Sequence, residues 1–256
     1  MMDERFYEEY FEIEDSHWWF VGRRRIIAAA LDRHLGAHDA TDRRILDVGC
    51  GTGYMLGFLG HWGEVTGVDA DPAAVAYSHR RGFTNVHRLE SDALPFETGS
   101  FDVVSAFDVL EHVEDDGRMV AEMAKVLKPG GTAIVTVPAY RALWGRQDEI
   151  SHHHRRYARR ELRRLLIRAG FDVERISSFN TILLPPIAAV RLSRRLVSRR
   201  GGGEMGSDFS MTRAGRVNDA LARIFGSEAA LVRRVDLPFG VSTLAVANRG
   251  AVVGSP

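Results

Sequence analysis

The residues of this sequence with the clearest chemical potential are a carboxylate and three evenly spaced glycines at positions 47–53. The run Asp-Val-Gly-Cys-Gly-Thr-Gly follows an apolar pair at 45–46. Branched apolar residues that give way to glycines predict a buried parallel strand, a tight loop and then a helix. The glycines permit positive φ and let a ligand approach the main chain without a Cβ in the way. Taken alone, they suit a dinucleotide, a phosphate or another nucleoside ligand.

The glycine spacing and the neighbouring acids narrow these alternatives. A dinucleotide fingerprint reads G-x-G-x-x-G with a pyrophosphate on the helix N-terminus, whereas the glycines here read G-x-G-x-G. Asp47 would repel a pyrophosphate and suits a ligand that is cationic at that end. No Lys-Ser or Lys-Thr pair follows the glycines, which argues against a phosphate loop. Asp69 ends the strand predicted at 65–68, where it can accept hydrogen bonds from ribose hydroxyls, whereas Asp71 before Pro72 suits a helix cap.

Four segments resemble, in order, the motifs of the class I S-adenosylmethionine (SAM) dependent methyltransferases. They are the glycine loop, the strand end at Asp69, the stretch 90–107 and the Lys-Pro-Gly-Gly turn at 128–131. SAM carries an ammonium and a sulfonium, which matches a carboxylate before the glycines. The resemblance implies that Asp92 accepts the adenine amino group and that the backbone of Ala93 contacts the ring edge. The cofactor residues expected on these grounds are Asp47, Gly49, Cys50, Gly51, Gly53, Asp69, Ala70, Asp92, Ala93, Phe107, Asp108 and His112.

Two of these residues also have plainer interpretations. His112 opens a predicted helix, where its side chain could simply hydrogen-bond, and this stays open beside the contact to the methionine end of SAM that the resemblance implies. Cys50 is the only cysteine, so no intramolecular disulfide forms. Nothing nearby in the sequence would activate Cys50 as a nucleophile, and the loop needs only a small residue there.

Aromatic residues dominate the N-terminal segment. Those at 6, 7, 10 and 11 fit one face of a helix, and three successive aromatics at 18–20 precede a helix predicted at 23–35. Because residues 18–20 cannot all face one way, at least one should line a cleft. The sequence His-Trp-Trp-Phe-Val-Gly-Arg-Arg resembles a pattern of a bacterial subgroup of the same family. In that family the segment before the first helix covers the cofactor, which implies Trp19 and Arg24 as cofactor or lid residues.

The loop at 140–157 carries the candidate acceptor chemistry, including three consecutive histidines. Adjacent side chains diverge on a regular backbone, so a metal site made by all three is not expected, and we predict no metal. A pKa near neutrality makes one of them a candidate general base. Resemblance to the H-x-R-R-Y element of the subgroup selects His153, with His152 and His154 as the other candidates; a purely structural role for His153 stays open. The expected substrate residues are Tyr140, Trp144, Arg156 and Tyr157.

The order of strands and helices predicts an α/β fold, a Rossmann-like doubly wound sheet. The family resemblance implies seven strands in the order 3-2-1-4-5-7-6, with strand 7 antiparallel. Strands 6 and 7 are predicted from 171 and from 240, and the roughly sixty residues between them far exceed ordinary connections. The predicted organisation is an N-terminal helical lid at 1–40, a SAM-binding core at 41–180, a mainly helical insert at 181–236, and a final core strand with a tail at 237–256.

The insert has two open interpretations. Its first part, 182–200, joins an aliphatic run containing Pro-Pro to several arginines. The run is too short to cross a bilayer, which needs about 20 residues, but it could lie on a membrane surface with its arginines outward. We favour a helix that covers the acceptor pocket or a dimer interface. A flexible connector at 201–210 and a helix at 213–225 are expected to follow.

Composition sets the remaining bounds. The 256 residues are 45% hydrophobic and 27% charged, with a formal net charge of +0, as in an ordinary globular domain. No nucleic-acid module accompanies the arginines and the acidic start lacks a secretory pattern. We therefore expect a cytoplasmic monomer or homodimer that meets membranes, if at all, through 182–200. The predicted function is O- or C-methylation of a small-molecule or lipid-like acceptor. A non-catalytic SAM-binding regulator stays open, and the glycine spacing disfavours a nicotinamide oxidoreductase.

Overall fold

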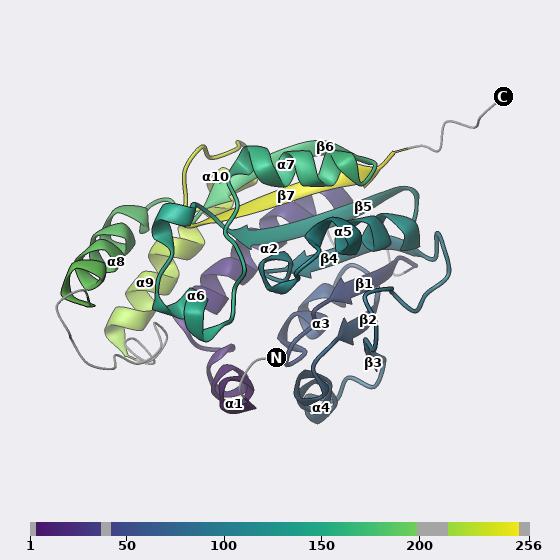
Figure 1. Ribbon diagram of the computed structural model, residues 1–256, viewed down its shortest axis with the longest axis horizontal. Helices are drawn as coiled ribbons and strands as arrows, with labels where there is room; N and C mark the ends of the chain where they lie inside the picture. The colour runs from purple at the N-terminus through teal and green to yellow at the C-terminus, as the bar shows by residue number, and fades with distance from the viewer. Residues whose placement is uncertain (1–3, 37–41, 199–214, 251–256) are drawn as a thin grey trace.

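A seven-stranded sheet in the order β3-β2-β1-β4-β5-β7-β6 forms the centre of the molecule (Figure 1). The computed structural model describes residues 4–36, 42–198 and 215–250. Strands β1 to β5 pair in parallel, and β7 is antiparallel to both of its neighbours. This order and this direction confirm the predicted topology. The strands are β1 Arg44–Val48, β2 Glu64–Asp69, β3 Val86–Arg88, β4 Phe101–Phe107, β5 Leu127–Pro138, β6 Phe171–Phe179 and β7 Ser242–Arg249.

Helices cover both faces of the sheet (Figure 1). α5 and α7 pack on one face together with Leu46 and Val104, and α2, α3 and α9 pack on the other with Ile45 and Val103. Neighbouring residues of one strand thus enter opposite cores, as the two-residue period of a strand requires. The helices are α1 Glu4–Ile13, α2 Trp18–Leu35, α3 Tyr54–Leu59, α4 Pro72–Arg80, η1 Leu110–His112, α5 Asp116–Val126, η2 Arg141–Leu143, α6 Arg146–Ile150, α7 Arg159–Arg168, α8 Leu184–Ser198, α9 Arg216–Ser227 and α10 Ala229–Val232.

Two element boundaries differ from the sequence-based expectation. The first core helix, α2, begins at Trp18 and not at Arg23, because His17 acts as its N-cap and accepts a hydrogen bond from the Trp19 amide at 3.3 Å. The expected turn at 127–132 belongs to β5, which starts at Leu127. Its register against β4 shifts there, and Gly130 has a φ of 76°.

The connection between β6 and β7 is helical, as predicted. It contains α8, α9 and α10, of which α9 packs against α2 through Phe225 and Trp18, with ring centroids 5.9 Å apart. The expected connector at 201–210 lies outside the described residues. Among the described helices, none has the length and apolar character needed to cross a membrane.

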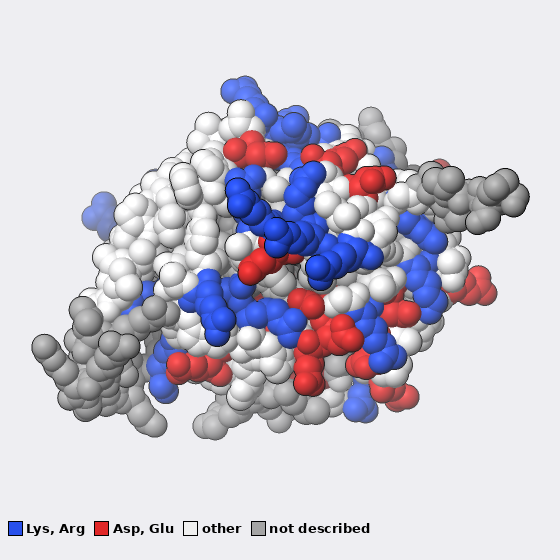
Figure 2. Space-filling model, turned by 45° about the horizontal axis from the view of Figure 1, so that its top comes forward, with Lys and Arg blue, Asp and Glu red and all other residues white. Residues whose placement is uncertain are grey.

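Charges of both signs share the surface shown in Figure 2. Basic side chains gather across the middle of this face, with acidic side chains on both sides of them. The formal net charge of +0 agrees with such a balance.

Candidate active site

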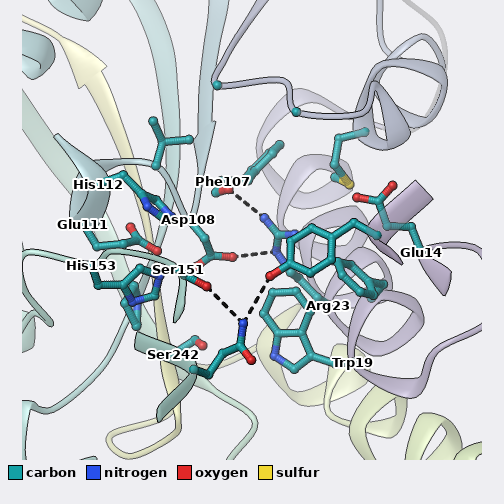
Figure 3. Close-up of a pocket in the computed structure, with 18 of the residues that line it drawn as sticks. Glu14, Trp19, Arg23, Phe107, Asp108, Glu111, His112, Ser151, His153 and Ser242 are labelled. Carbon is teal, nitrogen blue, oxygen red and sulfur yellow. Dashed lines mark hydrogen bonds and ion pairs between the residues drawn. The ribbon is translucent and has the colours of Figure 1, made fainter. Parts of the chain in front are cut away.

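A cavity of about 990 Å³ opens at the carboxyl ends of β1, β2 and β4. β1 lies between β2 and β4, where the strand order reverses, and open α/β sheets bind their ligands at such a point. The walls come from the N-terminal helices, the glycine loop, the end of β4, the loop after β5 and the insert. Figure 3 shows Trp19 and Arg23 on one side of this cavity and Glu111, His112 and His153 on the other.

The glycine loop shapes the cofactor end of the cavity. Gly49, Gly51 and Gly53 have φ values of 68°, 57° and 81°, a region that strongly favours glycine. A Cβ on Gly49 would come within 2.5 Å of a Val109 methyl group, whereas a Cβ on Gly51 would meet no atom within 4 Å. Gly49 therefore permits close packing, and Gly51 leaves open space for a ligand. Gly53 caps α3 and does not line the cavity.

Two carboxylates, one buried and one half-buried, stand near the ends of neighbouring strands in this half of the cavity. Asp47, at β1, accepts a hydrogen bond from the Ser105 hydroxyl at 2.6 Å, and burial raises its pKa to about 7. Asp69, at the end of β2, accepts hydrogen bonds from the amides of Gly51 and Asp71, both at 2.9 Å, and burial raises its pKa as well. A cationic ligand would offset the cost of desolvating these carboxylates.

Three smaller sequence-based expectations concern other residues in and around the cavity. Asp71 caps α4 by accepting a hydrogen bond from the Ala73 amide at 2.9 Å, as predicted. Cys50 is buried, and burial raises the pKa of its thiol, which fits a packing role. Ala70 and Phe107 line the cavity together with Asp108 and His112.

Arg23, and not Arg24, faces the cavity from the N-terminal segment. Its Nε lies 2.8 Å from Asp108 Oδ2, its Nη2 donates to the Phe107 carbonyl at 2.9 Å, and its guanidinium lies 4.9 Å from the Trp19 ring. Arg24 instead lies over the Tyr54 ring, outside the cavity wall. Because α2 begins at Trp18, Trp19 and Arg23 are one turn apart on one helix face, and that spacing was the missed signal.

Glu14, the residue that follows α1, attaches this helix to the glycine loop. The Thr52 hydroxyl donates a short hydrogen bond to Glu14 Oε2, and Arg81 Nη2 lies 2.9 Å from the same oxygen. Burial outweighs these contacts and raises the pKa of Glu14 to about 7. α1 thus contacts both the loop and α4, which places its Tyr7 and Tyr10 on the cavity wall.

The two residues assigned to adenine do not line the cavity. Asp92 is exposed and lies 3.1 Å from Arg118 Nη1, and the Ala93 amide contacts the Ser91 hydroxyl at 3.3 Å. Leu89 and Met119 form the wall on this side instead. The roles of Asp92 and Ala93 in cofactor binding stay predictions.

A carboxylate, a histidine and an arginine meet at the acceptor end. His153 Nδ1 lies 2.8 Å from Asp148 Oδ1, and Arg156 Nε donates to the same oxygen at 2.7 Å. Burial opposes ionisation of Asp148, but the contacts with His153 and Arg156 prevail and lower its pKa to about 2. Asp148 therefore stays ionised and orients the His153 ring, whose Nε2 is left for the cavity.

The other predicted acceptor residues are spread more widely. The wall includes His152, His154 and Arg156, but not Tyr140, Trp144 or Tyr157. Tyr157 is buried, with its hydroxyl 2.8 Å from Asp116 Oδ2 and 3.0 Å from the Leu110 carbonyl. Its position is that of a core residue between η1 and α5.

Unusual backbone conformations concentrate at the cavity. Among the described residues, the non-glycine residues with positive φ are Asp108, Tyr140, His152 and Asn180. All except Tyr140 line the cavity. Such conformations cost of order 1–3 kcal/mol each and cluster at functional sites.

Sequence reasoning missed two buried polar side chains of the wall. Glu111 is 0% exposed and neither carboxylate oxygen has a hydrogen-bond partner. Asn180 is 1% exposed, and its amide oxygen and nitrogen are likewise unpaired. Burying such groups unpaired is costly, so both are candidates to contact a ligand. Neither lies in a motif that singles it out.

The doubly wound sheet with its antiparallel β7, the glycine loop after β1 and the acid that ends β2 define the class I SAM-dependent methyltransferase fold. The chain belongs to the methyltransferase domain family, whose model matches residues 20–176. Asp47, Asp69 and the space beside Gly51 suit a cofactor that is a cation with a ribose. SAM, the cofactor of this family, has both features.

Relatives in sequence agree with this assignment. A protein of Mycolicibacterium smegmatis named "Probable S-adenosylmethionine-dependent methyltransferase" is 32% identical over 166 residues, which cover 63% of this chain and 62% of the relative. A ubiquinone biosynthesis O-methyltransferase of Xanthomonas oryzae pv. oryzae is 36% identical over 128 residues, or 45% and 54% of the two chains. The chain thus spans little more than half of the length of these curated relatives.

Solved structures show the same fold at lower identity. Phosphoethanolamine N-methyltransferase 2 of Haemonchus contortus, solved in complex with SAM, matches with a TM-score of 0.54 and 18% identity over 86% of this chain and 51% of that one. The [4+2]-cyclase SpnF matches with a TM-score of 0.58 and 22% identity, over 89% of this chain and 81% of that one. The fold alone therefore does not determine the reaction.

Proposed function

We propose that this protein transfers the methyl group of SAM to a hydroxyl oxygen of a small, largely apolar acceptor. The observation that carries this proposal is one cavity that is lined by the Asp47 and Asp69 carboxylates and by His153, whose ring Asp148 holds from behind the wall. Its volume of about 990 Å³ is at the upper end of the range typical of a single ligand, about 300–1,000 Å³. Such a cavity suits a cofactor and an acceptor side by side.

The cofactor residues are assigned by charge and position. When bound, SAM supplies an electrophilic methyl group, which passes to the acceptor oxygen as the carbon–sulfur bond breaks and its electron pair stays on sulfur. Asp69 accepts hydrogen bonds from the ribose hydroxyls, and Asp47 faces the cationic end. Trp19 and Arg23 cover the cofactor from α2, and the glycine loop orients it. Orientation of this kind is worth about 7–11 kcal/mol when it brings two reactants into line.

The acceptor end is apolar on the side of the insert. Leu183, Pro186, Ile187 and Val190, in and just before α8, line the cavity. This supports the pocket-covering interpretation of the insert over a membrane-surface helix. The relative named as a ubiquinone biosynthesis O-methyltransferase supports a hydroxyl on a small apolar molecule as the acceptor.

His153 is the residue proposed to activate that hydroxyl. Its Nδ1 is held by Asp148 at 2.8 Å, so Nε2 can take the hydroxyl proton as the oxygen attacks. General-base catalysis of this kind contributes about 10²–10⁴-fold. The same arrangement serves an acidic carbon, whereas an amine acceptor needs less help.

Three acceptors with the same tail test the proposal: 4-octylphenol, octanol and octylamine, each incubated with the full chain and SAM. We expect formation of S-adenosylhomocysteine and of the methyl ether of octylphenol, measured by mass spectrometry. Methylation of octylamine alone would contradict an oxygen acceptor. Saturable SAM binding without turnover of any of the three would contradict the enzyme and favour a SAM-binding regulator.

A further inference from the structure

Three metal-ligating side chains converge at the acceptor end of the cavity. Glu111, His112 and His153 each place one ligand atom within 4.8 Å of the other two. Figure 3 shows all three on the same wall, opposite Arg23 and Trp19. Among the described residues, this is the one group of three or more His, Cys, Asp and Glu side chains with such a geometry. It is distinct from the three consecutive histidines of the sequence, since only His153 belongs to both.

Glu111 is the observation that points to a ligand. It comes from the 3₁₀ turn after β4, is 0% exposed, and has no hydrogen-bond partner at either carboxylate oxygen. Its backbone carbonyl accepts a hydrogen bond from the His154 amide at 2.7 Å, which fixes this turn against the histidine loop. A buried carboxyl without a partner is destabilising unless a cation or a donor meets it. Among its described neighbours, the other charges are already matched.

Those matched charges are the carboxylates of Asp108 and Asp148, which lie beside arginines. Arg156 pairs with Asp148 at 2.7 Å and Arg23 with Asp108 at 2.8 Å. Arg191 Nη1 also lies 3.8 Å from Asp148 Oδ2, and none of these three arginines forms an ion pair with Glu111 among the described residues.

Both histidines are held as metal-binding histidines usually are. A ligating histidine donates its second ring N–H to a carboxylate or a backbone carbonyl, which leaves the other nitrogen for the metal. His153 contacts the Asp148 carboxylate through Nδ1 at 2.8 Å, so Nε2 is the free nitrogen. The His112 ring bonds to the backbone of Ser151. Each ring thus has one nitrogen engaged and one available.

We propose that Glu111, His112 and His153 bind one divalent cation of the zinc class at the acceptor end of the cavity. Two imidazoles and a carboxylate are a ligand set that leaves a catalytic zinc one open position, while Mg²⁺ prefers oxygen ligands alone. Tetrahedral bonds of about 2.0–2.1 Å place ligand atoms about 3.3 Å apart. The three side chains therefore close inward by rotation about their side-chain bonds when the cation binds.

The open position faces the space proposed for the acceptor, and this catalytic part of the inference rests on the proposed function. A divalent cation lowers the pKa of a hydroxyl that it contacts. The hydroxyl proton then passes to water, and His153 acts on the acceptor through the cation and not as a free base. Asn180, whose side-chain amide is unpaired and lines the same cavity, can hydrogen-bond a second polar group of the acceptor.

Binding is tested without any acceptor, by titrating the metal-free full chain with Zn²⁺ and by recording the visible spectrum of the Co²⁺ form. We expect one equivalent of Zn²⁺ per chain and the absorption bands of four- or five-coordinate Co²⁺. Glu111→Gln and His153→Ala should each weaken binding at least 100-fold, and Asp148→Asn by about 10–100-fold. His79→Ala, which removes an exposed imidazole at the end of α4, should leave the affinity unchanged.

Thermal unfolding separates loss of the ligand from loss of the fold. Zn²⁺ should raise the Tm of the wild type and not that of Glu111→Gln, which should bind SAM normally and, without cation, melt no lower than the wild type. Equal Zn²⁺ affinity in the wild type and Glu111→Gln would overturn the inference. Methyl transfer that persists in the presence of a chelator would contradict a catalytic role of the cation and would favour His153 as the base. One equivalent of bound Zn²⁺ without methyl transfer would instead overturn the proposed function.

Discussion

The two ends of the cavity are built in different ways. At the cofactor end, Asp47 and Asp69 end neighbouring parallel strands, and the glycine loop follows one of them directly. At the acceptor end, Glu111, His153 and Asn180 come from three segments far apart in the sequence. The first end is thus part of the sheet, whereas the second is assembled from loops and the insert. A fold of this kind can keep its cofactor chemistry while the acceptor end varies.

The largest effect should come from the acceptor end alone. His153→Ala removes the group that activates the hydroxyl, and we expect kcat to fall by about 10²–10⁴-fold. SAM affinity should stay near the wild-type value, because His153 contacts Asp148 and not the carboxylates proposed to hold the cofactor, Asp47 and Asp69. Steady-state kinetics and a SAM titration on the same preparation check this. A large parallel loss of SAM affinity would show that the two ends are not independent.

Among these variants, the largest change in the free energy of unfolding should come from loss of the ion pair between Arg23 and Asp108. Arg23 pairs with Asp108, and their side chains are 9% and 18% exposed, so Arg23→Ala leaves a mostly buried carboxylate uncompensated. We expect the free energy of unfolding to fall by about 3–5 kcal/mol, measured by urea denaturation. Arg24→Ala is the matched control, since it removes only a contact with the Tyr54 ring worth about 0.5–1 kcal/mol. Equal losses in the two variants would contradict the distinct role of Arg23.

The cofactor end should show a pH dependence of its own. The pKa of Asp47 is raised to about 7, and only the ionised carboxylate attracts the cationic end of SAM. Protonation below that pKa should therefore weaken SAM binding by about tenfold between pH 8 and pH 6. Calorimetric titrations at both pH values measure this, and Asp47→Asn should abolish it. Glu14 also has a pKa raised to about 7. The variant Glu14→Gln tests its contribution, and SAM binding by this variant should keep the pH dependence of the wild type.

The smallest effect should come from the apolar wall of the insert. Ile187→Ala shortens the aliphatic surface that meets the acceptor tail. Each methylene group of the tail that loses its contact with the shorter side chain should cost about 0.8 kcal/mol of binding free energy. KM for octylphenol should therefore rise about fourfold for each such group. SAM affinity should not change. Val217→Ala serves as control because Val217 is 63% exposed and lies outside the cavity wall. Equal KM values in both variants would argue against α8 as part of the acceptor pocket.

The sequence predicted the cofactor end of the cavity better than the acceptor end. Strand ends and the loops after them are local features, so Asp47, Asp69 and the cap at Asp71 could be placed from pattern alone. Arg23 was missed because the start of α2 depends on the cap at His17, and a shift of one residue on a helix changes the face by about 100°.

The convergence of Glu111, His112 and His153 could not be predicted from the sequence. It depends on how the turn after β4 packs against the loop after β5, joined by the hydrogen bond from the His154 amide to the Glu111 carbonyl at 2.7 Å. Such packing between segments far apart in the chain leaves no local periodicity to read. The same holds for Asn180, whose position at the end of β6 brings it to the wall only once the sheet has formed.

The central claim is that the strand-end carboxylates bind SAM, and its most direct test is a calorimetric titration of the wild type and Asp69→Ala with SAM. The account predicts saturable binding at one site, weakened about 10–150-fold in the variant, as expected for loss of charge-assisted hydrogen bonds worth about 1.5–3 kcal/mol. Asp71→Ala is the control, because it removes the helix cap but keeps the amide that donates to Asp69. This variant should have a lower free energy of unfolding and nearly the wild-type affinity for SAM. Absence of SAM binding to the wild type, or equal affinity in the wild type and Asp69→Ala, would contradict the account.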